Sequence, residues 1–281
     1  MSSGVKPMSS CVIETNGAAI RIAEGGAGEP ALVFLHYWGG SARTWQRVTD
    51  RLGGQVRWVA LDQRGWGGSV ATDGRYDLVA LADDVENVVR ALDLRRYVPV
   101  GHSMGGKVAQ IVATRRPRGL AGLVLVAPAP PTPMPVTEAQ RADRLASYGS
   151  RDGVLQALAV LAGTPLSDEL REQVIEDTLR GAPEAKRAWT DRGMIEDVSA
   201  GLDAVTIPVS ILVGSRDRVE HESALREVFG RLLPQATVRV LEGIGHLSPL
   251  EAPGELADAC ANLLAGLGSP AEKRQPEKRS S

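Results

Sequence analysis

The sequence has few cysteines, little net charge and no cluster of metal ligands, and each absence excludes a class of protein. Cys11 and Cys260 are the two cysteines among 281 residues, too few for a disulfide framework or a cysteine-rich metal site. The formal net charge is −2, without the basic stripe of a nucleic-acid binder. We therefore expect no metal, no cofactor and no nucleic-acid partner.

Long hydrophobic runs are missing as well. No apolar segment approaches the ~18 residues that a membrane span needs, and residues 1–10 lack the apolar centre of a signal peptide. These features predict a cytoplasmic protein without a membrane partner. The 43% hydrophobic and 23% charged residues are typical of a globular protein with a sizeable core. A monomer and a homodimer are both compatible with these numbers, and either state is expected.

What is present is an alternation of short apolar segments with amphipathic ones. The expected strands are 11–15, 18–22, 31–35, 56–61, 97–101, 120–127, 209–214 and 237–241. Most of them are continuous apolar runs, as in a sheet that is buried on both faces. Helical patterns at 77–92, 104–115 and 252–267 fall between them. The alternation predicts an α/β fold with a doubly wound, mostly parallel sheet of eight strands.

One stretch breaks this alternation. Residues 128–207 open with five prolines and continue with helical patterns but no convincing strand. We interpret 131–206 as a helical cap on a core formed by 11–130 and 207–267. The ends, 1–10 and 268–281, are polar or charged and are predicted to be disordered tails.

The strongest local motif is Gly101-His102-Ser103-Met104-Gly105-Gly106, between an expected strand and an expected helix. Strand, Gly-x-Ser-x-Gly and helix form a nucleophile elbow, whose sharp turn exposes the serine hydroxyl above the sheet. The glycines leave room for the close approach of the chain. The N–H of Met104, at the start of the helix, can then face a developing oxyanion.

Two other interpretations fit the same residues. Gly101 to Lys107 match the start of a phosphate-binding loop, but Val108 stands where that loop needs a hydroxyl for Mg²⁺. A glycine-rich turn with a purely structural role is the other alternative. The failed match at Val108 favours the nucleophile.

A serine nucleophile needs a base, and the sequence offers four histidines. His246 follows the last expected strand in a glycine-rich loop, at the sheet edge where open α/β folds place their sites. His102 neighbours the serine, but a sharp turn should direct its side chain elsewhere. His221 begins a polar helix. His246 is therefore the candidate base, and a loop histidine that caps the next helix is the alternative.

The base in turn needs an acid that fixes its tautomer. Asp217 follows the expected strand 209–214 at the same sheet edge. The other position for such an acid, after the strand 120–127, holds no carboxylate. Asp217 is the candidate acid, with an ordinary turn aspartate or helix cap as the alternative.

The order Ser103, Asp217, His246 in these contexts resembles the α/β-hydrolases over about residues 11–267. Residues 62–69, DQRGWGGS, are similar to the D-x-R-G-x-G-x-S loop of that family. Residues 35–40 stand where the family has His-Gly-x, and the resemblance implies that the N–H of Trp38 is the second oxyanion donor. Tyr37 replaces the usual glycine there, so its hydroxyl either contacts substrate or its ring packs beside the strand.

The resemblance implies a serine hydrolase that cleaves a small, largely apolar carboxylic ester or lactone through an acyl-enzyme. The serine at the elbow argues against haloalkane dehalogenases and epoxide hydrolases, which carry aspartate there. Small esterases, enol-lactonases and haloperoxidase-like members are the most similar branches. The substrate pocket is expected between cap and sheet, lined by His36, Tyr37, Trp66, His102, Tyr148 and Trp189.

Alternatives remain open at this point. The same three residues could serve a C–C bond hydrolase, a perhydrolase or an acyltransferase. A non-catalytic ligand-binding protein of the same fold is the alternative from another class, and a broken set of catalytic residues would indicate it.

Overall fold

The computed structural model describes residues 9–268 and contains one sheet of nine strands. The strands are β1 Ser9–Thr15, β2 Ala18–Gly25, β3 Ala31–Leu35, β4 Trp58–Leu61, β5 Val70–Ala71, β6 Tyr97–His102, β7 Leu123–Val126, β8 Val209–Gly214 and β9 Thr237–Leu241. Their order in the sheet is β1-β2-β4-β3-β6-β7-β8-β9, and β5 pairs with β2. The expected α/β fold is confirmed, with β5 as an additional strand whose two residues are too few to show a pattern.

Pairing changes direction once across the sheet. β1 and β2 form the antiparallel hairpin expected at Asn16-Gly17, and β2 pairs antiparallel with β4. From β4 through β3, β6, β7 and β8 to β9 every pair is parallel. The carboxyl ends of these six strands therefore meet at one edge of the sheet, where the loops that carry function gather.

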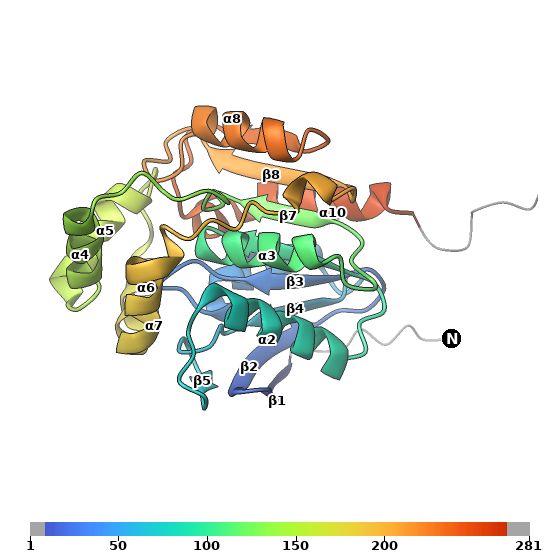
Figure 1. Ribbon diagram of the computed structural model, residues 1–281, viewed down its shortest axis with the longest axis horizontal. Helices are drawn as coiled ribbons and strands as arrows, with labels where there is room; N and C mark the ends of the chain where they lie inside the picture. The colour runs from blue at the N-terminus through green and yellow to red at the C-terminus, as the bar shows by residue number, and fades with distance from the viewer. Residues whose placement is uncertain (1–8, 269–281) are drawn as a thin grey trace, which may run out of the picture.

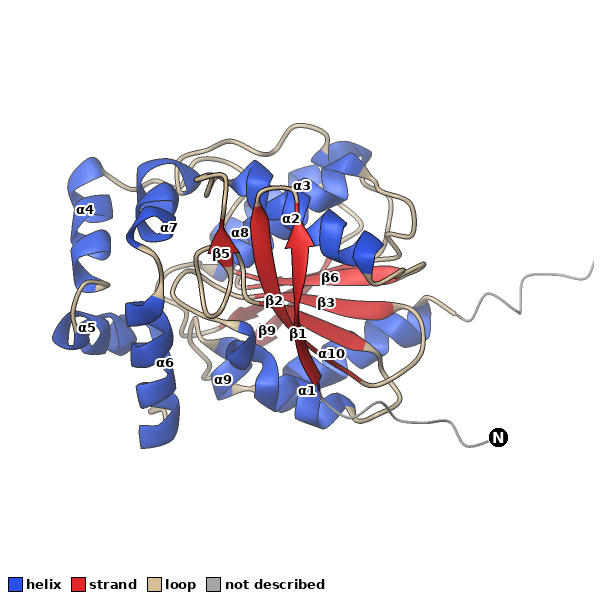
Figure 2. Cartoon of the chain, turned by 90° about the horizontal axis from the view of Figure 1, so that it is seen from below, coloured by secondary structure: helices blue, strands red, loops and turns tan. Residues whose placement is uncertain are grey.

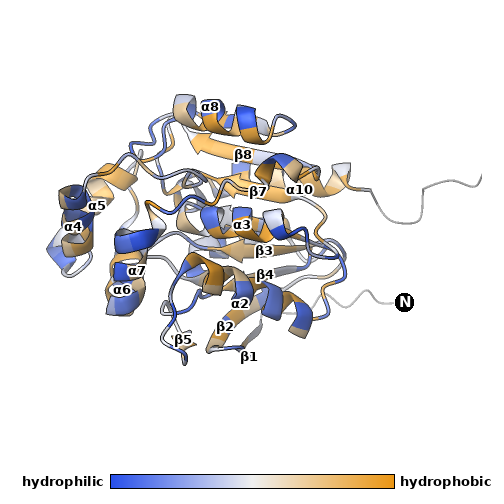
Figure 3. Cartoon of the chain, viewed as in Figure 1, coloured by the Kyte–Doolittle hydropathy of each residue, from blue (hydrophilic) through white to orange (hydrophobic). Residues whose placement is uncertain are grey.

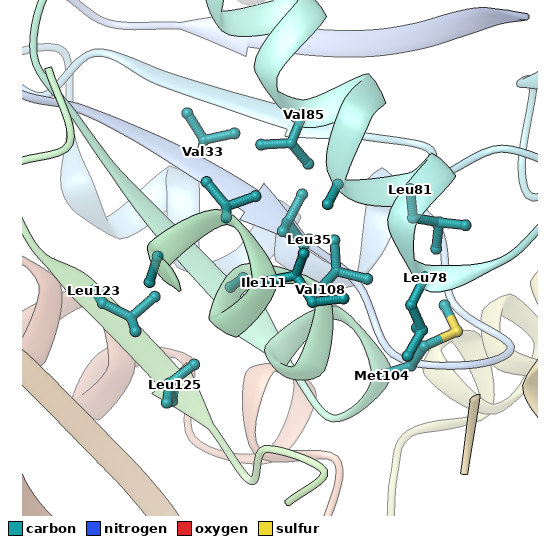
Figure 4. Packing of buried hydrophobic residues seen from close by; sticks show 14 of the residues in the cluster. Val33, Leu35, Leu78, Leu81, Val85, Met104, Val108, Ile111, Leu123 and Leu125 are labelled. Atoms are coloured by element: carbon teal, nitrogen blue, oxygen red, sulfur yellow. The ribbon is translucent and has the colours of Figure 1, made fainter. Parts of the chain in front are cut away.

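Helices cover both faces of the sheet (Figure 2). They are α1 Gln46–Leu52, α2 Leu78–Ala91, α3 Met104–Arg115, α8 Glu222–Leu232, α9 Ser248–Glu251 and α10 Pro253–Gly266, with short 3₁₀ helices η1 Ala42–Trp45 and η3 Leu202–Ala204. In β3, Val33 and Leu35 join the core under α2 and α3, whereas Leu32 and Phe34 join the core under α1 and α10. This alternation is the two-residue period of a strand buried on both faces. Figure 4 shows Val33 and Leu35 among the side chains of α2 and α3.

A helical insertion lies between β7 and β8. It consists of α4 Glu138–Ser147, α5 Arg151–Leu161, α6 Asp168–Arg180, α7 Pro183–Ala188 and the π-helix η2 Trp189–Gly193. Figure 1 places these helices together at one side of the sheet, and we call the segment from α4 to η2 the cap. Figure 3 shows hydrophobic central strands, whereas the cap helices mix both colours; α4 itself buries none of its residues.

The two predicted tails overlap the described residues only at Ser9, Ser10 and Gly268. Ser9 and Ser10, which were expected in a disordered tail, belong to β1 because they pair with Glu24 and Ala23. The other tail residues, 1–8 and 269–281, lie outside the described residues. None of the helices between residues 9 and 268 has the length and hydropathy needed to cross a membrane.

Candidate active site

Ser103 occupies the sharp turn between β6 and α3. Its backbone angles are φ 52° and ψ −113°, a region that side chains rarely occupy and that stores strain. A Cβ on Gly101 would lie 2.3 Å from the carbonyl oxygen of Gly105, and one on Gly105 would lie 2.5 Å from that of Leu35. Only glycine fits at these two positions, because the obstructing atoms belong to the backbone. The structure thus contains the sharp turn between strand and helix that the Gly-x-Ser-x-Gly motif predicts.

His246 and Asp217 form a buried pair at the neighbouring loops. His246 Nδ1 lies 2.8 Å from Asp217 Oδ2, and Asp217 Oδ1 accepts hydrogen bonds from the backbone N–H groups of Val219 and Glu220. Burial opposes the charge on Asp217, but the imidazole and the two N–H donors outweigh it and hold the pKa of this carboxyl below its usual value. Asp217 is therefore an anion at neutral pH.

Ser103 and His246 line the same cavity, of about 340 Å³, between the sheet edge and the cap. Apolar and aromatic side chains of the cap and of the residues that flank it form much of its wall: Met134, Tyr148, Ala157, Val160, Leu161, Trp189 and Met194. Within residues 9–268, no hydrogen bond joins the Ser103 hydroxyl to His246, whose Nδ1 is the ring atom that bonds Asp217. Such catalytic contacts are often long before substrate binds.

The predicted pocket residues separate into two groups. Tyr37, Tyr148 and Trp189 line the cavity, as does Trp38. His36, Trp66 and His102 do not, which differs from the expectation, because all three side chains turn inward and are at most 1% exposed. Proximity to a motif in the sequence did not fix the direction of these side chains.

His102 lies behind His246 rather than in the cavity. Its Nε2–H donates to the carbonyl oxygen of His246 over 2.8 Å, and the two rings are 5.2 Å apart between centroids. Burial and the neighbouring imidazole lower the pKa of His102 well below its usual value, so the ring is neutral. It supports the loop that carries His246.

His36 is a second neutral structural histidine. Its Nε2 accepts from the backbone N–H of Gln63, so Nδ1 carries the proton and donates to the carbonyl oxygen of Tyr37. The Gln63 side chain returns a hydrogen bond of 2.7 Å to the carbonyl oxygen of His36. Burial lowers the pKa of the His36 imidazole. These hydrogen bonds between His36, Tyr37 and Gln63 hold the backbone at the end of β3, just before Trp38.

The backbone around Trp38 is held by the cap. The Tyr148 hydroxyl donates to the carbonyl oxygen of Trp38 over 3.2 Å, and the two rings stack with centroids 3.8 Å apart. The Thr178 hydroxyl donates to the carbonyl oxygen of Gly39 over 3.1 Å. Asp177 accepts from the hydroxyl of Ser41 over 2.8 Å and pairs with Arg43. Asp177 and Thr178 were not among the predicted site residues, because no local motif marks them.

A carboxylate at the other end of the site was missed as well. One oxygen of Glu251 accepts from the N–H groups of Gly163, Thr164 and Gly245, at 2.8, 2.9 and 3.1 Å. The N–H of His246 donates to the carbonyl oxygen of Leu161 at the end of α5. The histidine loop and the cap are thus joined through their backbones.

Beneath the elbow lie two buried ionisable groups without a direct ion pair. Lys107 is fully buried in the first turn of α3, and its Nζ has no hydrogen-bond partner. Burial lowers its pKa to about 8. Burial and the adjacent Asp217 raise the pKa of the Glu220 carboxyl well above its usual value. Among the described residues no group of three or more His, Cys, Asp or Glu could hold a metal.

Sequence comparison agrees with this geometry. The sequence model of the alpha/beta hydrolase family matches residues 32–259. The chain belongs to the alpha/beta hydrolase family. Among curated relatives, 2-succinyl-6-hydroxy-2,4-cyclohexadiene-1-carboxylate synthase of Salmonella typhimurium is 29% identical over 260 residues, which cover 85% of this chain and 96% of the relative. The resemblance drawn from the motifs is confirmed at the level of the family.

Solved structures of this family superpose closely on the chain. An esterase from Exiguobacterium antarcticum has a TM-score of 0.84 at 20% identity, covering 92% of this chain and all of that one. A thermophilic esterase from Thermogutta terrifontis has a TM-score of 0.79 at 25% identity, covering 93% of this chain and all of that one. The protein is an alpha/beta hydrolase with esterase-like structural neighbours.

Proposed function

We propose that this alpha/beta hydrolase is a serine hydrolase that cleaves a small, largely apolar carboxylic ester or lactone. The hydrogen bond between His246 and Asp217, beside a serine in a strained elbow and in one cavity with it, carries the proposal. The buried carboxylate of Asp217 holds the proton on Nδ1, which leaves Nε2 to accept the proton of Ser103. The chemistry thus requires only groups that this chain supplies.

The reaction proceeds in two halves. His246 takes the proton of Ser103 as Oγ bonds to the substrate carbonyl carbon, and the backbone N–H groups of Trp38 and Met104 stabilise the oxyanion. His246 then gives the proton to the leaving oxygen as the ester bond breaks. In the second half His246 activates water, which releases the acid and regenerates the serine. One oxyanion donor is typically worth about 3 kcal/mol of barrier.

The cavity wall supports an apolar substrate. Its aromatic, leucine, valine and methionine side chains match an alkyl or aryl group, and desolvating such a group is favourable. Arg144 and Arg218 are the cationic members of the wall. They favour a second candidate, a reaction on a carboxylate-bearing substrate such as the name of the Salmonella typhimurium relative indicates.

The first experiment is intact-mass measurement after exposure to a fluorophosphonate. We expect a single adduct on the wild type and none on Ser103→Ala. Ser147→Ala is the matched control, because Ser147 lines the same cavity but donates its hydroxyl to the carbonyl oxygen of Arg144. A folded wild type without an adduct would contradict the proposal and favour a non-catalytic binding protein.

Turnover then separates the chemistries that share a reactive serine. We expect p-nitrophenyl esters and simple lactones to be hydrolysed with water as the acceptor. Added hydrogen peroxide or alcohol would yield peracid or a new ester from a perhydrolase or an acyltransferase. Cleavage of a C–C bond in a carboxylate substrate, without ester turnover, would favour the second candidate.

A further inference from the structure

A second cavity, of about 440 Å³, adjoins the site on the side of α2 and α7. Its floor is buried and mostly apolar, apart from Arg64, which is 1% exposed and paired with Asp84, and its rim carries charged side chains. The apolar residues of the floor are Trp66, Leu78, Leu81, Met104, Ala185 and Trp189. The rim includes Arg75, Glu184, Arg187, Asp191, Arg192 and Glu196. Nothing in the reaction described above uses this space.

Two residues connect this cavity to the reaction. Met104, whose N–H is the proposed oxyanion donor, also lines the second cavity, and its side chain lies beside Leu78 (Figure 4). Trp189 lines both cavities and is 4% exposed, so its ring is the partition between them. A thioether and an aromatic ring are both surfaces on which a flexible alkyl chain packs well.

Trp189 lies in a π-helical turn, an irregularity that often occurs at functional sites. A Cβ on Gly193 would lie 2.5 Å from the Trp189 ring, so the glycine allows the ring to fold back on its own turn. The partition is therefore one side chain held by a local turn, rather than a layer of secondary structure.

The proposed reaction indicates which part of the substrate lies toward the second cavity. His246 must protonate the leaving oxygen, so the alcohol part of an ester lies on its side of Ser103. His246 follows β9, whereas Trp66 follows β4, and these two strands lie on opposite sides of β6 in the sheet. The acyl part, which points away from the leaving group, therefore extends toward Met104, Trp189 and the second cavity.

We propose that the second cavity receives the distal part of a medium-length alkyl acyl chain, with Trp189 as the partition past which the chain runs. This inference rests on the proposed function, because it takes the direction of the chain from the ester reaction. The apolar floor binds the methylene groups, and the charged rim keeps the mouth in water. The substrate range then extends from small esters to esters of an unbranched acid longer than the first cavity can hold.

The test uses decanoate as a probe of the folded Ser103→Ala protein by isothermal titration calorimetry. Ala188→Trp, at the wall of the second cavity, should fill it and weaken decanoate binding at least tenfold. Ala159→Trp is the matched control, because Ala159 is an exposed cap residue that lines a separate surface hollow. Ala188→Leu gives a graded second variant. Equal affinities in all of these proteins, or no binding of decanoate, would overturn the proposal.

Kinetics give an independent measurement. In the serine-containing protein, Ala188→Trp should lower kcat/KM for p-nitrophenyl decanoate at least tenfold and leave that for the acetate within twofold. Trp189→Ala should raise the ratio of decanoate to acetate. An unchanged ratio in both variants, with normal fluorophosphonate labelling, would overturn the acyl cavity but not the hydrolase. No labelling, with decanoate binding still lost in Ala188→Trp, would overturn the hydrolase and leave a carboxylate-chain site.

Discussion

The two proposed oxyanion donors lie at the same site but are held by different parts of the molecule. The N–H of Met104 is fixed by the core, through a strained serine and glycines in backbone contact with β3 and β6. The loop of Trp38 is fixed by the cap, through Tyr148 and Thr178. We call the elbow around Met104 the core half of the site and the loop of Trp38 the cap half. The core half is positioned by the α/β sheet itself, whereas the cap half is positioned by the insertion that also lines the substrate cavity. Changes in the cap can therefore alter the reaction rate as well as substrate choice.

The largest effect should come from breaking the core half with Gly105→Ala. The new Cβ would lie 2.5 Å from the carbonyl oxygen of Leu35, and backbone cannot move aside as a side chain does. We expect a loss of at least 1–3 kcal/mol of unfolding free energy and more than a hundredfold lower labelling of Ser103. Urea unfolding and fluorophosphonate labelling rates measure the two effects.

Gly230→Ala is the control for that change. Gly230 is also a glycine inside a helix, α8, and nothing lies within 4 Å of its added Cβ. It should gain up to about 1 kcal/mol of stability from helix propensity. Equal behaviour of the two variants would show that the close approach at Gly105 does not constrain the elbow.

A change beneath the same elbow should act through pH. The pKa of Lys107 is about 8 in the folded protein and 10.5 as its reference value, so the unfolded chain binds more protons between these two pH values. Stability from this group therefore rises with pH from about 8 to 10.5, by about 3 kcal/mol in total. Lys107→Met should be more stable than wild type near pH 7, and the difference should vanish near pH 10.5.

Urea unfolding of both proteins from pH 6.5 to 10.5 tests this expectation. Lys186→Met is the contrasting variant, because the Lys186 Nζ donates to the carbonyl oxygens of Tyr148 and Leu179. Its replacement should destabilise the protein across this range. A pH-independent difference for Lys107→Met would contradict the depressed pKa.

The smallest effect should come from loosening the cap half with Thr178→Val. The substitution keeps the shape but leaves the carbonyl oxygen of Gly39 without its 3.1 Å hydrogen bond. We expect about 1 kcal/mol of lost stability and a fall in kcat of about tenfold or less. Thr190→Val removes another buried cap hydroxyl, bonded to Lys186 and Arg187, and should leave kcat unchanged. A matching fall in kcat for both variants would assign the effect to the cap in general.

The parts of the site that could be predicted are those marked by a short local motif or by the end of a predicted strand. The elbow needs six neighbouring residues, and the positions of Asp217 and His246 follow from the ends of apolar strands. Thr178 and Glu251 could not be found in this way, because the partner of Thr178 lies 139 positions away and the cap partners of Glu251 lie 88 and 87 positions away. Their roles depend on the position of the cap relative to the sheet, and no local sequence pattern predicts that position.

The pocket residues show a second limit. His36 and His102 were predicted to line the pocket, yet both rings are buried and form hydrogen bonds with backbone carbonyl oxygens. Residues next to one another in a strand point to opposite faces, so an error of one position reverses the direction of a side chain. Tyr37, by contrast, does line the cavity, and its ring lies 5.1 Å from that of His102.

The carboxylate of Glu251 has a consequence for access to the site. It holds the end of α5 and the loop of His246 with a single oxygen, at Gly163 and Thr164 on one side and Gly245 on the other. These two segments therefore cannot separate without breaking charge-assisted hydrogen bonds to one of them. A cap that lifted at α5 would also displace His246, the proposed base. At this side the cap therefore cannot open for substrate while His246 stays in place, and it forms a fixed wall of the proposed active site.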